Sequence, residues 1–220
     1  MRFLSCLVLS LTSCLVSCVV SWPAKADEPE VKVLFIGDSL TAGYGVRKEE
    51  AFPELVEQLL KNSQSDSPTH LHIINGGISG SLSSSAGSRV RYYLKLKPQI
   101  LVLELGANDA LKGTDPKLIK KNLAEAITLA QQNNMKVLLV GMQVFANFGE
   151  TYTQSFAKIF TELAREKKTK LMPFLLEDVA AKKELMQSDQ KHPNALGHKM
   201  IAENLIKYLK PMVNVEAQKK

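Results

Sequence analysis

The chain has 220 residues, of which 45% are hydrophobic and only 6% aromatic, and its formal net charge is +6. This size and hydrophobic content suit one globular domain with a sizeable, mostly aliphatic core. Basic residues are spread along the chain without a dense run interleaved with aromatic residues, which argues against a nucleic-acid-binding protein. The mild positive excess weakly favours transient contact with an anionic surface such as phospholipid.

The first 26 residues have the pattern of a secretory signal peptide. Arg2 supplies a positive charge, residues 3–22 are uncharged, and Ala24-x-Ala26 is a small-residue cleavage pattern. We therefore expect an exported protein, periplasmic or secreted, in which residues 27–220 form one domain. Cleavage removes two basic residues and no acidic residue, so the net charge falls from +6 to +4.

Two alternatives to cleavage stay open at the N-terminus. The uncharged run is nearly long enough to span a bilayer as a retained anchor. Leu15-Val16-Ser17-Cys18 and Leu11-Thr12-Ser13-Cys14 both resemble the lipobox of bacterial lipoproteins, and a lipid on Cys18 would tether the protein to a membrane. All three cysteines of the chain lie in this segment, so the cleaved chain would have neither a disulfide nor a thiol nucleophile.

Beyond the leader, hydrophobic periodicity predicts strands that alternate with helices. We expect strands over 31–36, 70–74, 99–105, 135–141 and 169–174, and helices over 52–60, 83–96, 116–133, 152–167 and 195–209. The apolar positions of the helix over 116–133 are Leu118, Ile119, Leu123, Ile127 and Ala130. This alternation predicts a three-layer α/β domain, with a parallel sheet covered by helices on both faces.

Three of the first four predicted strands end in small polar clusters. They are Gly37-Asp38-Ser39, Gly77-Ile78-Ser79-Gly80 and Gly106-Ala107-Asn108-Asp109. Because the carboxyl ends of parallel strands lie at one edge of a sheet, these clusters are expected to converge on one crevice. A fourth cluster, Asp189-x-x-His192-Pro193, comes from the C-terminal loop. Each cluster alone has an ordinary reading as a helix cap or a turn, and their joint occurrence favours a functional site.

The residue types in these clusters suit acyl transfer. The Ser39 hydroxyl is a poor nucleophile unless a base lies within hydrogen-bond reach and a third group orients that base. His192 is a candidate base, and Asp189, one helical turn earlier, is a candidate orienting acid. The oxyanion of the reaction needs preorganised donors, for which the backbone N–H groups of Ser39 and Gly80 and the side-chain amide of Asn108 are candidates.

The same blocks resemble the ordered motifs of the GDSL, or SGNH, hydrolases over nearly all of the chain beyond the leader. Ile78-Ser79-Gly80, the segment 104–111 and the segment 143–152 are similar to the bacterial exported thioesterase, lysophospholipase and arylesterase branch. The resemblance implies a flavodoxin-like fold with a five-stranded parallel sheet, and neither a metal nor a cofactor. It assigns Ser39, Asp189 and His192 as a catalytic triad, with Gly80 and Asn108 as oxyanion donors.

Several neighbouring residues carry further expectations. Phe145 and Phe148 are candidates for contact with the acyl chain of a substrate, and the alternative is that they pack against the following helix. Asp38 and Asp109 are expected to tie the strand-end loops together through backbone N–H groups. Lys191, beside His192, is expected to point to solvent. His70, His72 and His198 have no matching role in this chemistry and are taken as structural. No two histidines have metal-ligand spacing with acids.

These residues favour a serine esterase of broad specificity, acting as a monomer on small-molecule or lipid esters and thioesters. A carbohydrate O-acetylesterase acting on envelope polysaccharide is the alternative, and it would share every catalytic residue. A third hypothesis, a phosphate- or nucleotide-binding module at residues 37–45, is disfavoured because neither a Walker A lysine nor a complete Gly-x-Gly-x-x-Gly motif is present.

Overall fold

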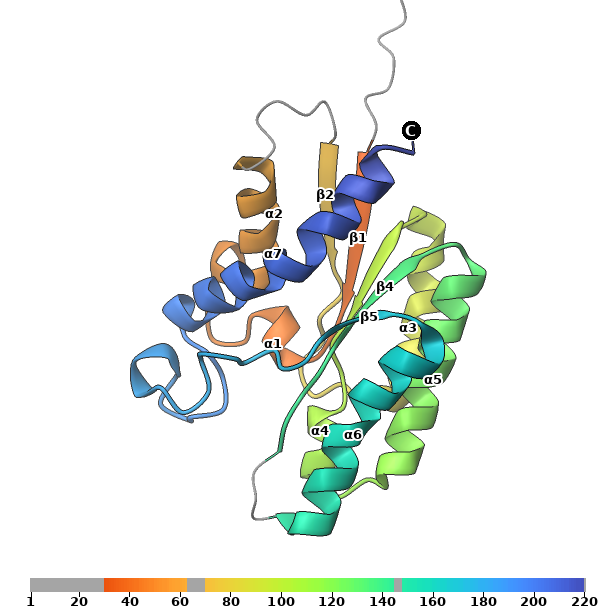
Figure 1. Cartoon of the computed structure of the whole chain (residues 1–220). Coiled ribbons are helices and arrows are strands. Elements are labelled where there is room, and N and C mark those ends of the chain that lie inside the picture. Colours follow the sequence, from red (N-terminus) through yellow and green to blue (C-terminus); the bar gives the residue numbers. More distant parts are fainter. Residues whose placement is uncertain (1–29, 63–69, 145–147, 220) are drawn as a thin grey trace, which may run out of the picture.

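The computed structural model describes residues 30–62, 70–144 and 148–219, so the predicted signal peptide and Phe145 lie outside the described residues. The strands are β1 Glu30–Ile36, β2 His70–Asn75, β3 Ile100–Leu103, β4 Lys136–Val140 and β5 Lys170–Met172. The α-helices are α1 Ser39–Ala42, α2 Phe52–Asn62, α3 Ala86–Tyr93, α4 Ala107–Leu111, α5 Pro116–Gln132, α6 Glu150–Lys167 and α7 Ala195–Ala217. Figure 1 shows their arrangement.

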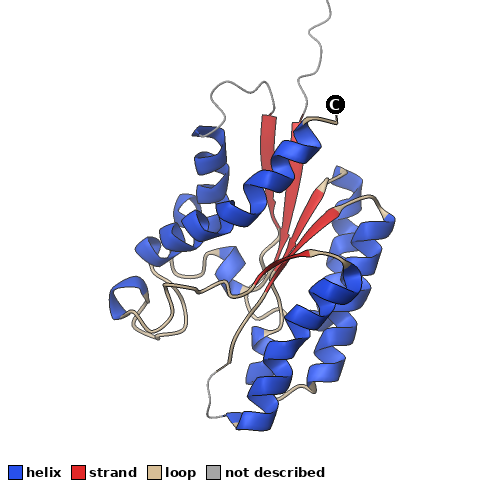
Figure 2. Ribbon diagram, viewed as in Figure 1, coloured by secondary structure: helices blue, strands red, loops and turns tan. Residues whose placement is uncertain are grey.

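The strands form one parallel sheet in the order β2-β1-β3-β4-β5. Helices α2 and α7 pack together on one face, and α3, α5 and α6 cover the other (Figures 1 and 2). Since β1 and β3 lie inside the sheet with both faces covered, their side chains are almost all buried, as continuous apolar strands require. The predicted three-layer α/β architecture is confirmed.

The apolar stripes of the helices explain most of the core. In α6 the four residues Phe156, Ile159, Phe160 and Leu163 are buried, as their helical spacing indicates. Among the apolar positions of α5, Leu118 is 49% exposed. The buried stripe of α5 begins one residue later, at Ile119, and Leu118 therefore lies beside the stripe rather than within it.

Helix α7 is longer than the sequence predicts. It continues through Pro211 to Ala217, although a proline inside a helix removes a backbone hydrogen bond and costs about 3 kcal/mol. Met212 and Val213, directly after the proline, are buried in the core, and this apolar contact offsets the cost. Among the described residues, no helix has the length and apolar character needed to cross a membrane.

The order of the strands brings the predicted polar clusters to one edge. Strands β2, β1 and β3 are neighbours, with Phe35 of β1 in register with Asn75 and Ile36 in register with Leu103. The clusters that follow these three strands therefore emerge side by side at the carboxyl edge of the sheet. This is where open α/β sheets place their ligands.

Candidate active site

The turn after β1 presents Ser39 at the first position of α1. The Asp38 carboxylate caps this short helix, because its Oδ1 accepts a hydrogen bond of 3.0 Å from the Leu40 N–H. Gly43 ends the helix in the left-handed conformation, with φ of +74°, which glycine adopts without strain. The strand-turn-helix leaves Ser39 half-buried, while the residues on either side of it are buried.

The structure brings Ser39, His192 and Asp189 together, although Ser39 and His192 are 153 residues apart in sequence. Ser39 Oγ lies 2.9 Å from His192 Nε2, and His192 Nδ1 lies 2.6 Å from Asp189 Oδ2. The hydrogen bond from His192, with backbone N–H groups of Lys191 and His192, lowers the pKa of Asp189 to about 2. Asp189 is thus ionised at neutral pH, and its charge favours the tautomer of His192 that carries the ring proton on Nδ1.

Hydrogen bonds hold the loop that carries Asp189 and His192 against the Ser39 turn. Gln187 Nε2 donates to the Tyr44 carbonyl at 2.7 Å and to the Pro193 carbonyl at 2.9 Å. The Tyr44 ring lies 4.6 Å from the His192 ring, centroid to centroid. Sequence reasoning missed Tyr44 and Gln187, because neither contact has a local signature. Lys191 is exposed, as predicted.

Backbone donors lie at the edge where the strand-end clusters meet. Among the described residues, neither the Ser39 N–H nor the Gly80 N–H donates to a protein acceptor. Gly80 has φ of +76°, and a Cβ there would meet no heavy atom within 4 Å. The left-handed backbone therefore favours glycine at this position, whatever the space around it.

The Asn108 amide is already engaged in this conformation. Its Nδ2 donates to Asp38 Oδ2 at 3.1 Å and to the Ser81 carbonyl at 3.1 Å. An amide nitrogen carries two hydrogens, so both are used by the protein. Asn108 is thus placed between the first two loops of the site, and donation to a substrate oxygen requires it to leave one of these acceptors.

Asp109 ties two strand-end loops together through a backbone N–H, as predicted, whereas Asp38 does so through the side-chain amide of Asn108. Asp109 accepts from the Ser83 N–H at 2.7 Å and from Ser83 Oγ at 2.6 Å. Asp38 joins the Leu40 N–H to the Asn108 amide. Burial raises the pKa of Asp38 to about 6.

Two buried titratable residues beneath the Ser39 turn were not predicted. Glu104, directly after β3, is fully buried, and its Oε2 accepts from the Asp38 N–H and from Thr41 Oγ1. Arg89 of α3 donates through Nη2 to the carbonyls of Gly37 and Gly76. In the sequence, the signal for Glu104 is its place at the end of an apolar strand. This place did not suggest burial, because a fully buried glutamate is rare.

Phe148 and His198 are placed by contacts within the fold. The Phe148 ring lies 6.1 Å from the ring of Tyr152 on α6, which matches the alternative of packing against the following helix. His198 is fully buried, and its Nδ1 accepts from the Phe52 N–H at 3.2 Å. This contact between α7 and α2 agrees with the structural role expected for His198.

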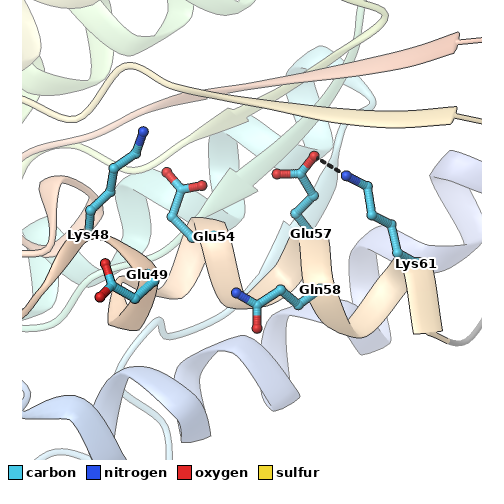
Figure 3. A pocket seen from close by; sticks show the side chains of 6 residues that line it. All are labelled: Lys48, Glu49, Glu54, Glu57, Gln58 and Lys61. Carbon is cyan, nitrogen blue, oxygen red and sulfur yellow. Dashed lines mark hydrogen bonds and ion pairs between the residues drawn. The ribbon is translucent and has the colours of Figure 1, made fainter.

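Two surface hollows lie away from these residues. One, of about 190 Å³, is bordered by charged side chains of α2 and the preceding turn (Figure 3). The other, of about 700 Å³, lies at the amino ends of β4 and β5, where Lys136 and Lys170 border it, at the sheet edge opposite Ser39. Neither hollow is lined by a predicted site residue. Over the residues described, no three or more His, Cys, Asp and Glu side chains are grouped so as to hold a metal ion.

Comparison with known proteins gives consistent matches. The model of the GDSL-like lipase/acylhydrolase family matches residues 35–200. An arylesterase of Vibrio mimicus is 35% identical over 84% of this chain and 92% of its own length. The thioesterase 1/protease 1/lysophospholipase L1 of Escherichia coli K12 is 33% identical over 83% of this chain and 85% of its own length.

A solved structure is similar over the same region. The psychrotrophic esterase EstA from Pseudoalteromonas sp., in a structure inhibited by monoethylphosphonate, superposes with a TM-score of 0.77 and 32% identity. The match covers 83% of this chain and 98% of EstA.

Proposed function

The chain belongs to the GDSL-like lipase/acylhydrolase family and is an esterase of that family, and from this premise we propose that it hydrolyses carboxylic esters and thioesters through an acyl-enzyme on Ser39. His192 acts as the general base and Asp189 orients it. The observation that carries the proposal is the continuous hydrogen-bonded line from Ser39 Oγ through the His192 ring to Asp189 Oδ2, at 2.9 and 2.6 Å.

In the acylation step, Ser39 Oγ attacks the carbonyl carbon of the substrate while its proton passes to His192 Nε2. The Asp189 carboxylate stabilises the imidazolium that forms. The carbonyl oxygen becomes an oxyanion, which the N–H groups of Ser39 and Gly80 stabilise. When the tetrahedral intermediate collapses, the bond to the alcohol or thiol breaks, and the leaving group takes the proton from His192.

In the deacylation step, water attacks the acyl-enzyme and gives a proton to His192. The second tetrahedral intermediate then collapses, and the carboxylic acid leaves as Ser39 Oγ recovers the proton. Asn108 contributes its amide to both oxyanions by exchanging the Ser81 carbonyl for the substrate oxygen. Each oxyanion donor contributes about 2.7–4 kcal/mol to lowering the barrier.

The relatives named above support aryl esters, thioesters and lysophospholipids as substrate classes. Phe145 and Phe148, in the segment after β4, are proposed to contact the acyl chain, with Phe148 doing so in addition to its contact with Tyr152. We further propose that the enzyme is a monomer that is exported after loss of residues 1–26. The intact mass of the exported form tests the cleavage site, and retention of a lipid on Cys18 would contradict it.

Substitution of the nucleophile tests the proposed function. Ser39→Ala is expected to lower kcat for p-nitrophenyl octanoate by at least about 10⁴-fold, because the triad acts as a unit. The thermal unfolding temperature should stay close to that of the wild type. Full activity in Ser39→Ala would refute the proposal.

Substrate class is tested by acyl-length profiles on p-nitrophenyl esters and acyl-CoA. We expect octanoyl and longer chains to be hydrolysed at least as well as acetyl. A sharp preference for acetyl would instead favour the O-acetylesterase alternative.

A further inference from the structure

Glu104 is a buried acid that contacts the nucleophile turn and lies outside the proposed triad. Its backbone N–H donates to the Ile36 carbonyl at 2.8 Å, which continues the β1–β3 pairing by one residue. The side chain is completely buried and extends beneath residues 38–41. This position places a carboxyl group against the turn that carries Ser39.

One oxygen of this carboxyl makes two contacts with the turn. Oε2 accepts from the Asp38 N–H at 3.2 Å and from Thr41 Oγ1 at 2.8 Å. Asp38 precedes Ser39 by one residue and Thr41 follows it by two, so the two contacts span the nucleophile. Thr41 is itself fully buried, so without Glu104 both donors would lose this acceptor in a place with little access to water, which is unfavourable.

The first glycine of the Gly37-Asp38-Ser39 motif makes room for this contact. A Cβ at Gly37 would overlap Thr41 Oγ1 and Glu104 Oε2. The φ of Gly37 lies outside the left-handed region. The need for glycine at this position therefore comes from the close approach of the Glu104 and Thr41 side chains.

The surroundings of Glu104 favour an uncharged carboxyl. Its other oxygen, Oε1, is buried without a hydrogen-bond partner among the described residues. Burial and the nearby charge of Asp38 raise the pKa of Glu104 well above its usual value, and the Arg89 guanidinium opposes this shift only in part. An uncharged Glu104 carboxyl therefore affects the Ser39 turn through its hydrogen bonds rather than through a net charge.

We propose that Glu104 is a positioning residue of the esterase reaction, which fixes the turn from Asp38 to Thr41 and thereby holds Ser39 Oγ and the Ser39 N–H in their reactive places. The inference rests on the proposed function of Ser39 and adds a residue that does not touch the substrate. A shift of about 1 Å in a reacting group costs on the order of 10²-fold in rate, so a relaxed turn should lower kcat more than it changes KM.

Two substitutions of similar length separate positioning from charge and from folding. Glu104→Gln keeps an oxygen that accepts both hydrogen bonds, whereas Glu104→Met keeps the length but has no such oxygen. Thr41→Val removes one of the two donors with little change in shape. Steady-state hydrolysis of p-nitrophenyl octanoate gives kcat and KM, and thermal unfolding reports whether each full-length variant is folded.

We expect Glu104→Met to lower kcat about 100-fold with KM within about 3-fold of the wild type. Glu104→Gln should retain kcat within about 5-fold, and Thr41→Val should fall between the two. Wild-type kcat in folded Glu104→Met would overturn the proposal. It would also be overturned if folded Glu104→Gln were as impaired as Glu104→Met, because kcat would then depend on the carboxyl charge of Glu104 rather than on its hydrogen-bonding oxygen.

If Glu104→Met does not fold, Thr41→Val decides the question, since unchanged kcat in that variant would contradict the proposal. The measurement separates this inference from the proposed function. A wild type that does not hydrolyse esters fails the proposed function, whereas an active wild type with an equally active Glu104→Met variant fails only the positioning role.

Discussion

The turn that carries Ser39 and the loop that carries Asp189 and His192 are held in place by different kinds of interaction. The turn that carries Ser39 is buried, and Asp38, Glu104 and Arg89 hold it through hydrogen bonds with almost no solvent access. The loop that carries His192 is exposed, and the Asp189 side chain is 38% accessible to solvent. Asp189 is held by contacts within three residues, because its Oδ1 accepts from the N–H groups of Lys191 and His192.

Because of this difference, substitutions in the two regions should affect the stability of the fold and the esterase activity differently. Buried polar groups cost free energy when they lose a partner, so changes beneath the Ser39 turn should affect both folding and activity. An exposed pair such as Asp189 and His192 contributes little to stability because solvent screens it. Changes in the His192 loop should therefore lower activity while leaving folding almost unchanged.

Of the changes that compare the two regions, Asp189→Asn in the exposed loop is expected to have the largest effect on activity. The amide keeps an oxygen for the loop N–H groups but removes the charge that stabilises the imidazolium, and kcat/KM should fall about 10³–10⁴-fold. Urea unfolding should show a change within about 1 kcal/mol. Asp178→Asn, at another exposed acid, is the control and should retain activity. A destabilised Asp189→Asn protein would contradict the comparison.

Arg89→Met is the corresponding change beneath the buried turn. It removes the donor to the carbonyls of Gly37 and Gly76, so the free energy of unfolding should fall by on the order of 3 kcal/mol. Esterase activity should fall as well, because Gly37 begins the Ser39 turn. Arg91→Met, at an exposed position of the same helix, should change stability by less than about 0.5 kcal/mol. Equal stability of the two variants in urea would show that the buried turn is not held as described.

His198 provides a pH test of how the exposed loop is anchored, since α7 begins directly after that loop. Burial lowers the pKa of His198 to about 4, from 6.5 in the unfolded chain. The unfolded state therefore binds more protons between these values, and stability is lost as the pH falls from about 6.5 to 4. The full loss is about 3 kcal/mol at 1.36 kcal/mol for each pKa unit.

We expect His198→Gln to lose less stability than the wild type between pH 7 and pH 4.5, measured by urea unfolding. His72→Gln, at an exposed histidine of β2, should follow the wild-type dependence. Parallel curves for wild type and His198→Gln would place the acid sensitivity elsewhere.

Much of the fold could be predicted from the sequence, because long elements carry a clear hydrophobic period. The four buried residues of α6 and the three polar clusters at the ends of β1, β2 and β3 follow from spacing alone. Helices α1 and α4 were not predicted, because four or five residues are too few to show a helical period. The end of α7 was placed too early, because the burial of Met212 and Val213 outweighs the effect of Pro211.

The residues of the site could be named from the sequence, but their hydrogen bonds could not. Ser39, Asp189 and His192 belong to compact motifs, and the structure places them in contact. Glu104 and Arg89 contact the Ser39 turn from separate elements of the fold. No local sequence pattern therefore indicates that they lie near Ser39. The engagement of Asn108 with the Ser81 carbonyl likewise depends on how two loops meet in space.

The most direct test of the account is the site at which a serine-reactive fluorophosphonate labels the purified enzyme, determined by peptide mass spectrometry. We predict one adduct, on Ser39, whose formation parallels the loss of esterase activity and is greatly slowed in His192→Ala. Loss of activity with the adduct on another residue would contradict the account, as would complete labelling of Ser39 in an enzyme that still hydrolyses esters.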